Sequence, residues 1–378
     1  KASVDRLGLD PKEIGDVTVG NVQMGGAYAV RLPTARTIPI HPSHKHKQGP
    51  ARMAQLVAGF PETVPLYCVN RQCSSGLQAV ANVAESIISG RIDAGIGCGV
   101  ESMTNGGGVK DAGNNMPPMD LNSIVENKLA RECLTPMGVT SENVASRYGI
   151  TREMQDEMAV LSHNKSLRAQ KEGLFRDEIL PVTVEWEDPK TGDVKDIRVT
   201  KDDGPRLGTT KERLAKLRAV FKKDGTTTAG NSSQVSDGAA AVVLMRRSKA
   251  NELNMPILAS MRGFTVVGVK PDEMGIGPAV AIPAICEMTG IRVSDVDVFE
   301  LNEAFASQAV YCVRKLNIPI EKVNPLGGAI SLGHPLGCTG ARCVATLIHQ
   351  LRRSKKRLGV VTMCIGTGMG AAALFEAE

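Results

Sequence analysis

The stretch PLYCVNRQCSSGLQAVANVAESIISGRIDAGIGCGV (residues 65–100) decides the fold class of this chain. An apolar run ends near Val69 and a turn rich in serine and glycine follows it. An alanine-rich segment with helical spacing then covers residues 75–89, and a second apolar run covers residues 93–99. Strand, tight turn, helix and strand in this order are typical of an α/β protein with a parallel sheet.

The same alternation continues on both sides of this stretch. A strand is predicted over residues 16–21 and a helix over residues 52–59. Further along, GAAAVVLM (residues 238–245) begins a second set of strands and helices that runs to the end of the chain. In that set GVVTMCIGTGMG (residues 359–370) is similar to the earlier AGIGCGVESM (residues 94–103). The repetition indicates two related α/β halves.

The alternation is interrupted once, by a more polar region rich in Met, Asp and Lys. Amphipathic helices are predicted there over residues 141–148 and 152–172, with Thr140 and Thr151 as candidate N-terminal caps. We interpret this region as an inserted, mostly helical subdomain. The predicted division is a first half at 1–104 completed by 237–257, an inserted domain at 105–236, and a second half at 258–378.

Composition excludes several classes of protein. The net charge of +5 is modest and aromatic residues make up only 3% of the 378 residues, whereas single-stranded nucleic-acid binding needs basic grooves with stacking aromatics. No apolar run reaches the roughly 18 residues of a membrane span, and residues 1–10 contain no apolar core of a signal peptide. We therefore expect no nucleic-acid partner, no membrane partner and no export. The basic clusters at 211–218 and 352–357 are interpreted as solvated helix faces in preference to phosphate sites.

The cysteines and histidines do not form a metal or disulfide pattern. The nine cysteines are an odd number, and none forms a CxxC pair, so a reducing compartment is expected. Three of the six histidines, His41, His44 and His46, lie in a proline-rich and basic stretch at 27–49 without a cysteine or carboxylate beside them. We interpret that stretch as a surface loop and predict no metal site.

Three glycine-rich turns contain the residues with the most reactive side chains. Cys73 lies in VNRQCSSG (residues 69–76), His334 in GGAISLGHPLGCTGAR (residues 327–342) and Cys364 in CIGTGMG (residues 364–370). A cysteine is nucleophilic as its thiolate, so a base must take its proton, and amides at a helix start lower the pKa of the thiol. A lone cysteine is more often a buried structural residue. The two further motifs favour a catalytic thiol with a histidine as base and a second acid/base group.

Two further motifs lie between Cys73 and His334 along the chain: AGNSSQVSDGAAA (residues 229–241) and NEAF (residues 302–305). The set resembles the thiolase family over nearly the whole chain, and within that family the degradative 3-ketoacyl-CoA type found in peroxisomes. The resemblance implies two related α/β halves packed as a five-layered αβαβα core with an inserted loop domain. It also implies thiolytic cleavage of 3-ketoacyl-CoA in β-oxidation, with CoA as co-substrate and no bound cofactor, by a peroxisomal homodimer.

The resemblance implies a role for each matching residue. Cys73 would accept the acyl group, His334 would activate it, and Cys364 would be a second acid and base. Asn302 would hold a water that forms one oxyanion hole with His334, and the amides of Cys73 and Gly366 would form the other. Four further residues would line the channel for the pantetheine arm: Met137, Ser233, Ala304 and Phe305.

Two departures from the family pattern are expected to matter for folding. The first strand of the family, which carries an RTPF-like motif, has no counterpart in this sequence, and residues 27–49 have no counterpart in the family. The final residues FEAE are not an SKL-type peroxisomal address.

Alternatives stay open. A ketosynthase-type condensing enzyme shares the fold, but Cys364 in CIGTG favours a thiolase. A biosynthetic acetoacetyl-CoA thiolase would use the same catalytic residues. A catalytically silent acyl-CoA-binding protein is the alternative from another class, and a disulfide between Cys73 and Cys364 under oxidant is an accessory possibility.

Overall fold

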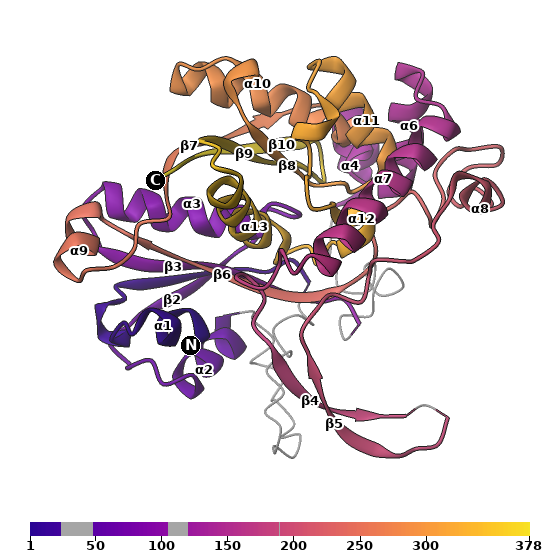
Figure 1. The fold of residues 1–378 in the computed structure, drawn as a ribbon. Coiled ribbons are helices and arrows are strands. Elements are labelled where there is room, and N and C mark those ends of the chain that lie inside the picture. Colours follow the sequence, from indigo (N-terminus) through magenta and orange to yellow (C-terminus); the bar gives the residue numbers. More distant parts are fainter. Residues whose placement is uncertain (24–47, 105–119, 189) are drawn as a thin grey trace.

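Two four-stranded sheets, stacked with helices between and outside them, make up the body of the molecule (Figure 1). The structure is a computed structural model that describes residues 1–23, 48–104, 120–188 and 190–378. His41, His44 and His46, and most of the stretch at 27–49, lie outside the described residues.

The first sheet has the strand order β2-β1-β3-β6. Its strands are β1 (Asp16–Gly20), β2 (Leu66–Val69), β3 (Ala94–Ser102) and β6 (Asp237–Met245). β1 is parallel to both β2 and β3, so that Val19 pairs with Cys68 on one side and Cys98 on the other, and β6 is antiparallel to β3. The strands predicted from the sequence are confirmed. The parallel arrangement places the ends of β1, β2 and β3 at one edge, where the turn with Cys73 begins.

The second sheet repeats this pattern with the order β7-β10-β9-β8. Its strands are β7 (Ala259–Gly268), β8 (Val298–Leu301), β9 (Leu358–Ile365) and β10 (Met369–Ala377). β8 is parallel to β9 and β10 is antiparallel to it, as β1 and β6 are to β3. The strands of the two similar glycine-rich segments, β3 and β9, thus occupy equivalent positions, which confirms that the halves are related. Among the described residues, β7 covers the outer edge of β10 but no strand covers that of β6.

Two helices fill the layer between the sheets. They are α3 (Ser75–Ile88) and α13 (Thr339–Ser354), which pack against each other. Leu77 and Val80 of α3 join Leu347 of α13 and Val361 of β9 in one apolar cluster. The first half of α3 is buried all round, as expected of a helix enclosed on both sides. The turns with Cys73 and His334 each lead into one of these helices, so their packing brings the two turns together.

Helices also cover the outer faces of both sheets (Figure 1). α1 (Ala2–Leu7) and α2 (Gln48–Val57) lie on the first sheet, where Val4 and Ile14 pack against Val17. α10 (Gly277–Thr289) and α11 (Ala306–Lys315) lie on the second, where Ile282 packs against Phe299. The result is five layers, helix, sheet, helix, sheet and helix. α2 begins and ends earlier than the predicted helix at 52–59. The remaining helices in the described part of these two halves are α9 (Arg247–Glu252), α12 (Ala329–Leu332), η1 (Pro11–Glu13), η4 (Pro271–Ile276), η5 (Val293–Asp295) and η6 (Ile320–Lys322).

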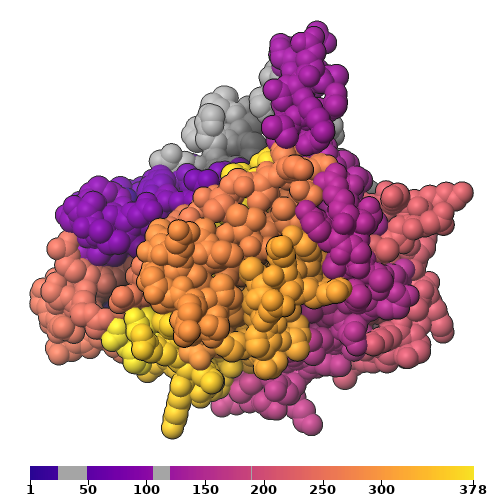
Figure 2. Space-filling view, turned by 90° about the horizontal axis from the view of Figure 1, so that it is seen from above, coloured from indigo at the N-terminus to yellow at the C-terminus, as the bar shows by residue number. Residues whose placement is uncertain are grey.

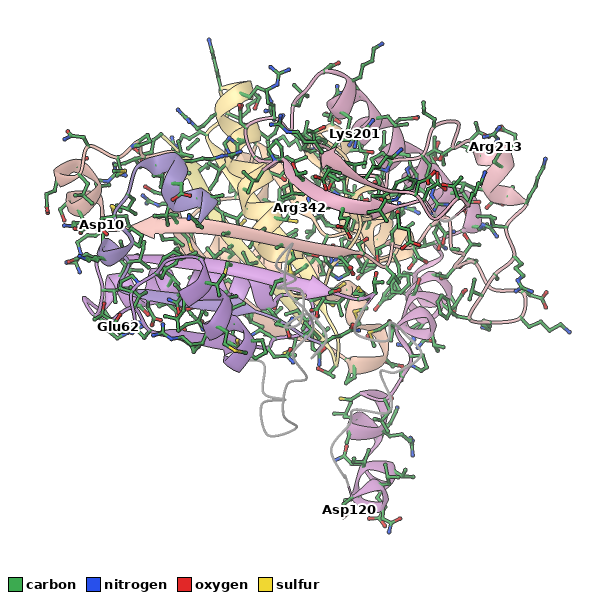
Figure 3. All side chains as sticks on the ribbon, turned by 90° about the horizontal axis from the view of Figure 1, so that it is seen from below. Asp10, Glu62, Asp120, Lys201, Arg213 and Arg342 are labelled. Atoms are coloured by element: carbon green, nitrogen blue, oxygen red, sulfur yellow. The ribbon has the colours of Figure 1, made fainter. Side chains whose placement is uncertain are left out.

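The described part of the region between β3 and β6 is mostly helical but also contains an exposed hairpin. Its elements are α4 (Leu121–Glu126), α5 (Lys128–Glu132), α6 (Met137–Tyr148), α7 (Arg152–Lys171), β4 (Val182–Glu187), β5 (Val194–Val199) and α8 (Lys211–Ala215). Figures 2 and 3 show α4 and α5 as an arm that projects from the body, with Asp120 at its far end. No helix among the described residues combines the length and apolarity that crossing a membrane requires.

The predicted helix caps in this region are half correct. Thr151 caps α7, since its side chain accepts a hydrogen bond from Met154 N. Thr140 does not begin a helix, because α6 starts at Met137. The Thr140 hydroxyl instead donates to Met137 O at 2.7 Å, a back-bond that threonine can make inside a helix.

The two halves touch backbone to backbone at four glycines. A Cβ at Gly99 of β3 would lie 2.0 Å from Gly337 O, and one at Gly76 of α3 would lie 2.7 Å from the same oxygen. A Cβ at Gly340 would lie 2.1 Å from Leu77 N, and one at Gly337 would lie 2.7 Å from Gly20 O. Only glycine permits such an approach, because any side chain would push the helices and strands apart.

Gly99→Ala is expected to destabilise the protein. The added methyl group meets a backbone carbonyl that cannot rotate away, and overpacking of this kind costs about 1 to 3 kcal/mol or more. Thermal unfolding followed by circular dichroism should show a melting temperature several degrees lower. Gly268→Ala is the matched control, because Gly268 is exposed and no described atom lies within 4 Å of its added Cβ. Equal melting temperatures for the two variants would contradict this account of the interface.

Candidate active site

Cys73 lies in the turn between β2 and the start of α3. The turn is tight: Gln72 has a φ of 47°, and Ser75 Oγ accepts a hydrogen bond from Arg71 N at 2.9 Å. The side chain of Cys73 is partly buried, and burial raises the pKa of its thiol. Backbone amides of Gly366 and of Cys73 itself oppose this rise because they stabilise the thiolate, whereas the charge of Glu101 adds to the rise. The turn containing Gly366 therefore lies beside the sulfur atom of Cys73.

Cys364 lies near the end of β9, close to Cys73. Its side chain is fully buried, in contact with a small apolar cluster of Met274, Ala304 and Phe305. Burial raises the pKa of the thiol well above its ordinary value, and the nearby Cys73 raises it further. Cys364 is therefore a neutral thiol at physiological pH and has a proton to give.

The turn between β9 and β10 brings Gly366 to Cys73. Its backbone is left-handed at Thr367 and Gly368, where φ is 70° and 92°. A Cβ at Gly368 would lie 2.5 Å from Val269 O, so the turn is pressed onto the end of β7. Val269 N also donates to Gly368 O at 2.8 Å. The Gly366 amide is thus held in place by its neighbours.

His334 is buried and its ring has a defined orientation. Its Nδ1 lies 2.7 Å from Thr339 Oγ1, and that hydroxyl donates to Pro335 O at 3.0 Å. Because the hydroxyl proton is used on the carbonyl, Thr339 accepts from Nδ1–H, which leaves Nε2 without a proton. Burial, and next the charge of Arg342, lower the pKa of His334 to about 3. The imidazole is therefore neutral, with its basic nitrogen turned toward Asn302.

Asn302 follows β8, and its backbone extends the sheet, with Asn302 N donating to Thr362 O at 2.9 Å. Its side-chain Nδ2 lies 3.3 Å from His334 Nε2 and is the donor of that pair. Its Oδ1 is buried and has no hydrogen-bond partner among the described residues. A buried amide oxygen of this kind needs a donor, such as water or a ligand.

Glu303 connects NEAF to the loop before His334, a contact that the sequence analysis does not identify. Its buried carboxylate accepts from Ser162 Oγ at 2.7 Å, from Asn324 Nδ2 at 2.7 Å and from Ile330 N at 3.3 Å. Desolvation raises its pKa, and these hydrogen bonds oppose the rise. The position of Glu303 next to Asn302 in NEAF was a usable signal, but its partners are far away in the sequence.

The four residues expected to line a substrate channel gather around the same turns. Met137 is partly exposed at the start of α6, and its Sδ lies 3.7 Å from where a Cβ at Gly366 would be. Ser233 N donates to Ala304 O at 3.0 Å, and Phe305 packs edge-on against Phe221 with ring centroids 6.4 Å apart. These residues come from three separate segments of the chain. Ala304 and Phe305 contact Cys364, Met137 lies beside Gly366, and Ser233 is joined to Ala304.

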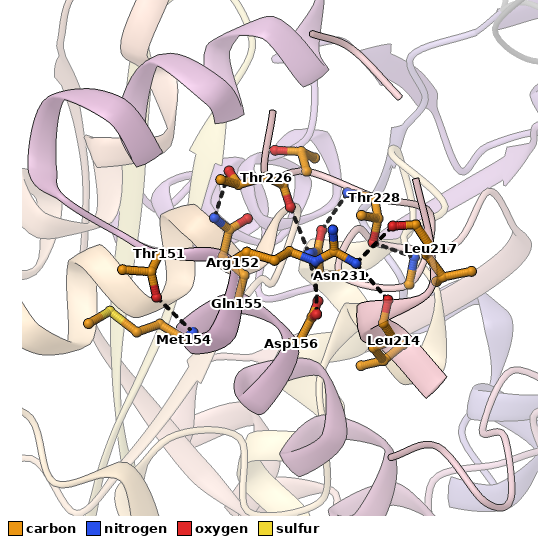
Figure 4. Close-up of polar contacts among 12 residues, drawn as sticks. Thr151, Arg152, Met154, Gln155, Asp156, Leu214, Leu217, Thr226, Thr228 and Asn231 are labelled. Atoms are coloured by element: carbon orange, nitrogen blue, oxygen red, sulfur yellow. Dashed lines mark hydrogen bonds and ion pairs between the residues drawn. The ribbon is translucent and has the colours of Figure 1, made fainter. Parts of the chain in front are cut away.

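The loop with Ser233 is fixed to α7 by a polar network (Figure 4). Asn231 Nδ2 donates to Asp156 Oδ1 at 3.0 Å, and Arg152 Nε donates to Asp156 Oδ2 at 2.8 Å. Arg152 also donates to Leu214 O at 2.6 Å, which attaches the segment around α8. Ala306 N donates to Asn231 O at 2.9 Å and joins the loop to α11. The inserted region and the second half are therefore connected beside the site.

Some side chains of the two basic clusters have partners within the protein. Lys211 pairs with Glu157 at 2.7 Å, and Arg213 donates to Gly208 O. Arg353 likewise donates to Leu174 O. Within the part of the chain that the structure describes, no group of three or more His, Cys, Asp or Glu side chains has the arrangement of a metal site.

Comparisons with known proteins agree with this geometry. The family "Thiolase, N-terminal domain" matches residues 41–248, and "Thiolase, C-terminal domain" matches residues 255–377. The peroxisomal 3-ketoacyl-CoA thiolase A of Mus musculus is 58% identical over 370 residues, which cover 97% of this chain and 81% of that protein.

Two crystal structures of a relative from Saccharomyces cerevisiae are also similar. The dimeric peroxisomal thiolase is 46% identical with a TM-score of 0.84, covering 100% of this chain and 87% of that one. A second structure of peroxisomal 3-ketoacyl-CoA thiolase is 44% identical with a TM-score of 0.72, covering 98% and 84%, and is described as five layered with two core domains of identical topology. Two family matches that together span most of the chain, and relatives at this identity, establish that the chain belongs to the thiolase family.

Proposed function

We propose that this protein cleaves 3-ketoacyl-CoA with CoA to give acetyl-CoA and a shortened acyl-CoA, as an acyltransferase of peroxisomal fatty-acid β-oxidation. The relative from mouse supports this activity and location through its name, its 58% identity and its coverage of 97% of the chain. The observation that carries the proposal is the meeting of Cys73, Gly366 and Cys364, with the neutral His334 on a turn that approaches the start of α3 at Gly76. The dimeric yeast relative supports a homodimer.

In the first half-reaction, the Cys73 thiol gives its proton to Nε2 of His334 and attacks the keto carbon of the substrate. The bond between the α and β carbons then breaks, and its electron pair leaves as the enolate of acetyl-CoA. Cys364 protonates that enolate at carbon, which its neutral thiol suits. The products are an acyl-thioester on Cys73 and acetyl-CoA.

In the second half-reaction, the Cys364 thiolate takes the proton of the CoA thiol. CoA attacks the acyl-thioester, the shortened acyl-CoA leaves, and Cys73 recovers its proton from His334. One thioester replaces another, so no cofactor is consumed. The two half-reactions share an enzyme-bound intermediate and imply ping-pong kinetics.

Negative charge develops on two different oxygens in this scheme. The Oδ1 of Asn302, which has no hydrogen-bond partner in the part of the chain that the structure describes, suits a water that would donate, together with protonated His334, to one of them. The amides of Cys73 and Gly366 suit the other, because both already stabilise negative charge at Cys73. Met137, Ser233, Ala304 and Phe305 would contact the pantetheine arm.

We also propose that the chain divides into a first half at 1–104 completed by 237–257, an inserted domain at 105–236 and a second half at 258–378.

Incubation with a 3-ketoacyl-CoA in the absence of free CoA should acylate Cys73 in stoichiometric amount. Intact-protein mass spectrometry should show the acyl mass, peptide mapping should place it on Cys73, and added CoA should remove it. Cys73→Ala should form no adduct and lose at least about a thousandfold in kcat. A folded wild-type protein that never forms the adduct would point to a silent acyl-CoA-binding protein instead.

Thr339→Val should lower kcat by about 10- to 100-fold with little change in KM. The substitution keeps the shape of the side chain but removes the acceptor of Nδ1–H, so the ring can turn and change its tautomer. Thr339→Ser keeps the hydroxyl and is the matched control, expected to retain most activity. Steady-state kinetics of both variants check this, and equal losses in the two would refute a role for the hydroxyl.

Iodoacetamide should modify Cys73 before Cys364, and the rate at Cys73 should keep rising through alkaline pH. The pKa of the Cys73 thiol is raised, so its thiolate fraction keeps growing at pH values above the ordinary pKa of a cysteine. Cys364 is fully buried, and the pKa of its thiol is raised well above the ordinary value. Peptide mapping after brief exposure at several pH values measures both rates. A rate at Cys73 that levels off below neutral pH would contradict the expected direction.

A further inference from the structure

We propose that Glu101 is a positioning residue, whose carboxylate holds the turn that carries His334 against the first half and so fixes His334 relative to Cys73. The proposal rests on the proposed function, because it takes these two residues as base and nucleophile. Cys73 belongs to the first half, whereas His334 belongs to the second. Their separation therefore depends on how the halves are joined.

Glu101 lies near the end of β3 and is 1% exposed. Its Oε2 accepts from Gly337 N at 2.9 Å and from Val22 N at 2.9 Å. Its Oε1 accepts from Gln23 N at 3.0 Å and from Asn21 Nδ2 at 3.2 Å. One carboxylate thus joins the end of β3, the segment after β1 and the turn after His334.

The contact with Gly337 lies where the two backbones are closest. A Cβ at Gly337 would lie 2.7 Å from Asn21 Cα and 2.8 Å from Val100 O. Gly337 is three residues after His334, and Thr339, which orients the imidazole ring, is two residues further on. Glu101 therefore fixes the backbone of the turn between His334 and Thr339, and the Thr339 side chain sets the tautomer of His334.

Electrostatic activation of the nucleophile does not explain a carboxylate here. The charge of Glu101 raises the pKa of the Cys73 thiol, which opposes formation of the thiolate. Cys364 and His334, which belong to the same site, are neutral. The hydrogen bonds to backbone amides are what the carboxylate contributes, since charged acceptors make the stronger ones.

Glu101→Gln tests the proposal, because it keeps the size of the side chain but replaces one acceptor oxygen with an NH2 group that cannot accept. Glu101→Asp keeps the charge but is one methylene too short to reach all its partners, and it serves if the first variant does not fold. Asp237→Asn is the matched control. Asp237 caps the neighbouring strand by accepting from Thr104 N at 3.0 Å and Ser102 Oγ at 3.1 Å, and both bonds stay within the first half.

Two measurements are made on each variant: steady-state kinetics, and hydrogen–deuterium exchange of the peptide covering residues 333–341. In Glu101→Gln we expect kcat to fall by about tenfold or more, because small displacements of reacting groups are costly, with KM within about twofold. Exchange in residues 333–341 should become faster, since the neutral amide oxygen of glutamine is a weaker acceptor for the Gly337 N–H than a carboxylate, and its NH2 group cannot accept at all. Asp237→Asn should leave both quantities close to those of the wild type.

Unchanged exchange in Glu101→Gln would overturn the tether. Faster exchange with kcat unchanged would overturn the positioning role. Equal changes in Asp237→Asn would also overturn it, because they would show that the effect of Glu101→Gln is a general loss of stability. If the wild-type protein forms no acyl-Cys73, the proposed function fails by itself, and the exchange experiment still decides whether Glu101 holds the turn.

Discussion

The close approach of backbone to backbone between the two halves is the constraint on which the site depends. Gly99 and Gly76 of the first half both meet the carbonyl of Gly337, and Gly340 meets Leu77. The nucleophile comes from one side of this contact and the histidine from the other. A methyl group at any of these glycines would force the halves apart. The position of Cys73 relative to His334 therefore depends on how closely α3 packs on α13.

Burial sets the chemical state of the reacting groups. It raises the pKa of both thiols and lowers that of His334, so that all three are neutral before substrate binds. Charge then appears only when a proton moves between them or onto the substrate. Backbone amides at Cys73 and Gly366, which the two turns hold in place, stabilise negative charge at Cys73.

Local pattern predicted the regular elements well. The strands β1, β3 and β6 and helix α7 agree with the predictions because their apolar spacing or caps lie within a few residues. The start of α6 was predicted four residues late, since Thr140 resembles a cap but bonds back to Met137 O. Glu303 and Glu101 were not identified as site residues, because their partners lie 21 to 236 residues away.

The sequence by itself determined the α/β class, the two related halves and the membership of Cys73, His334, Cys364 and Asn302 in recurring motifs. These features depend on local spacing, which the chain carries in its order of residues. Tertiary structure alone decided the tautomer of His334, the direction in which each pKa is shifted and the contacts that hold the two halves together. These depend on desolvation and on contacts between distant segments, such as Glu101 with Gly337. No pattern within one segment can encode them.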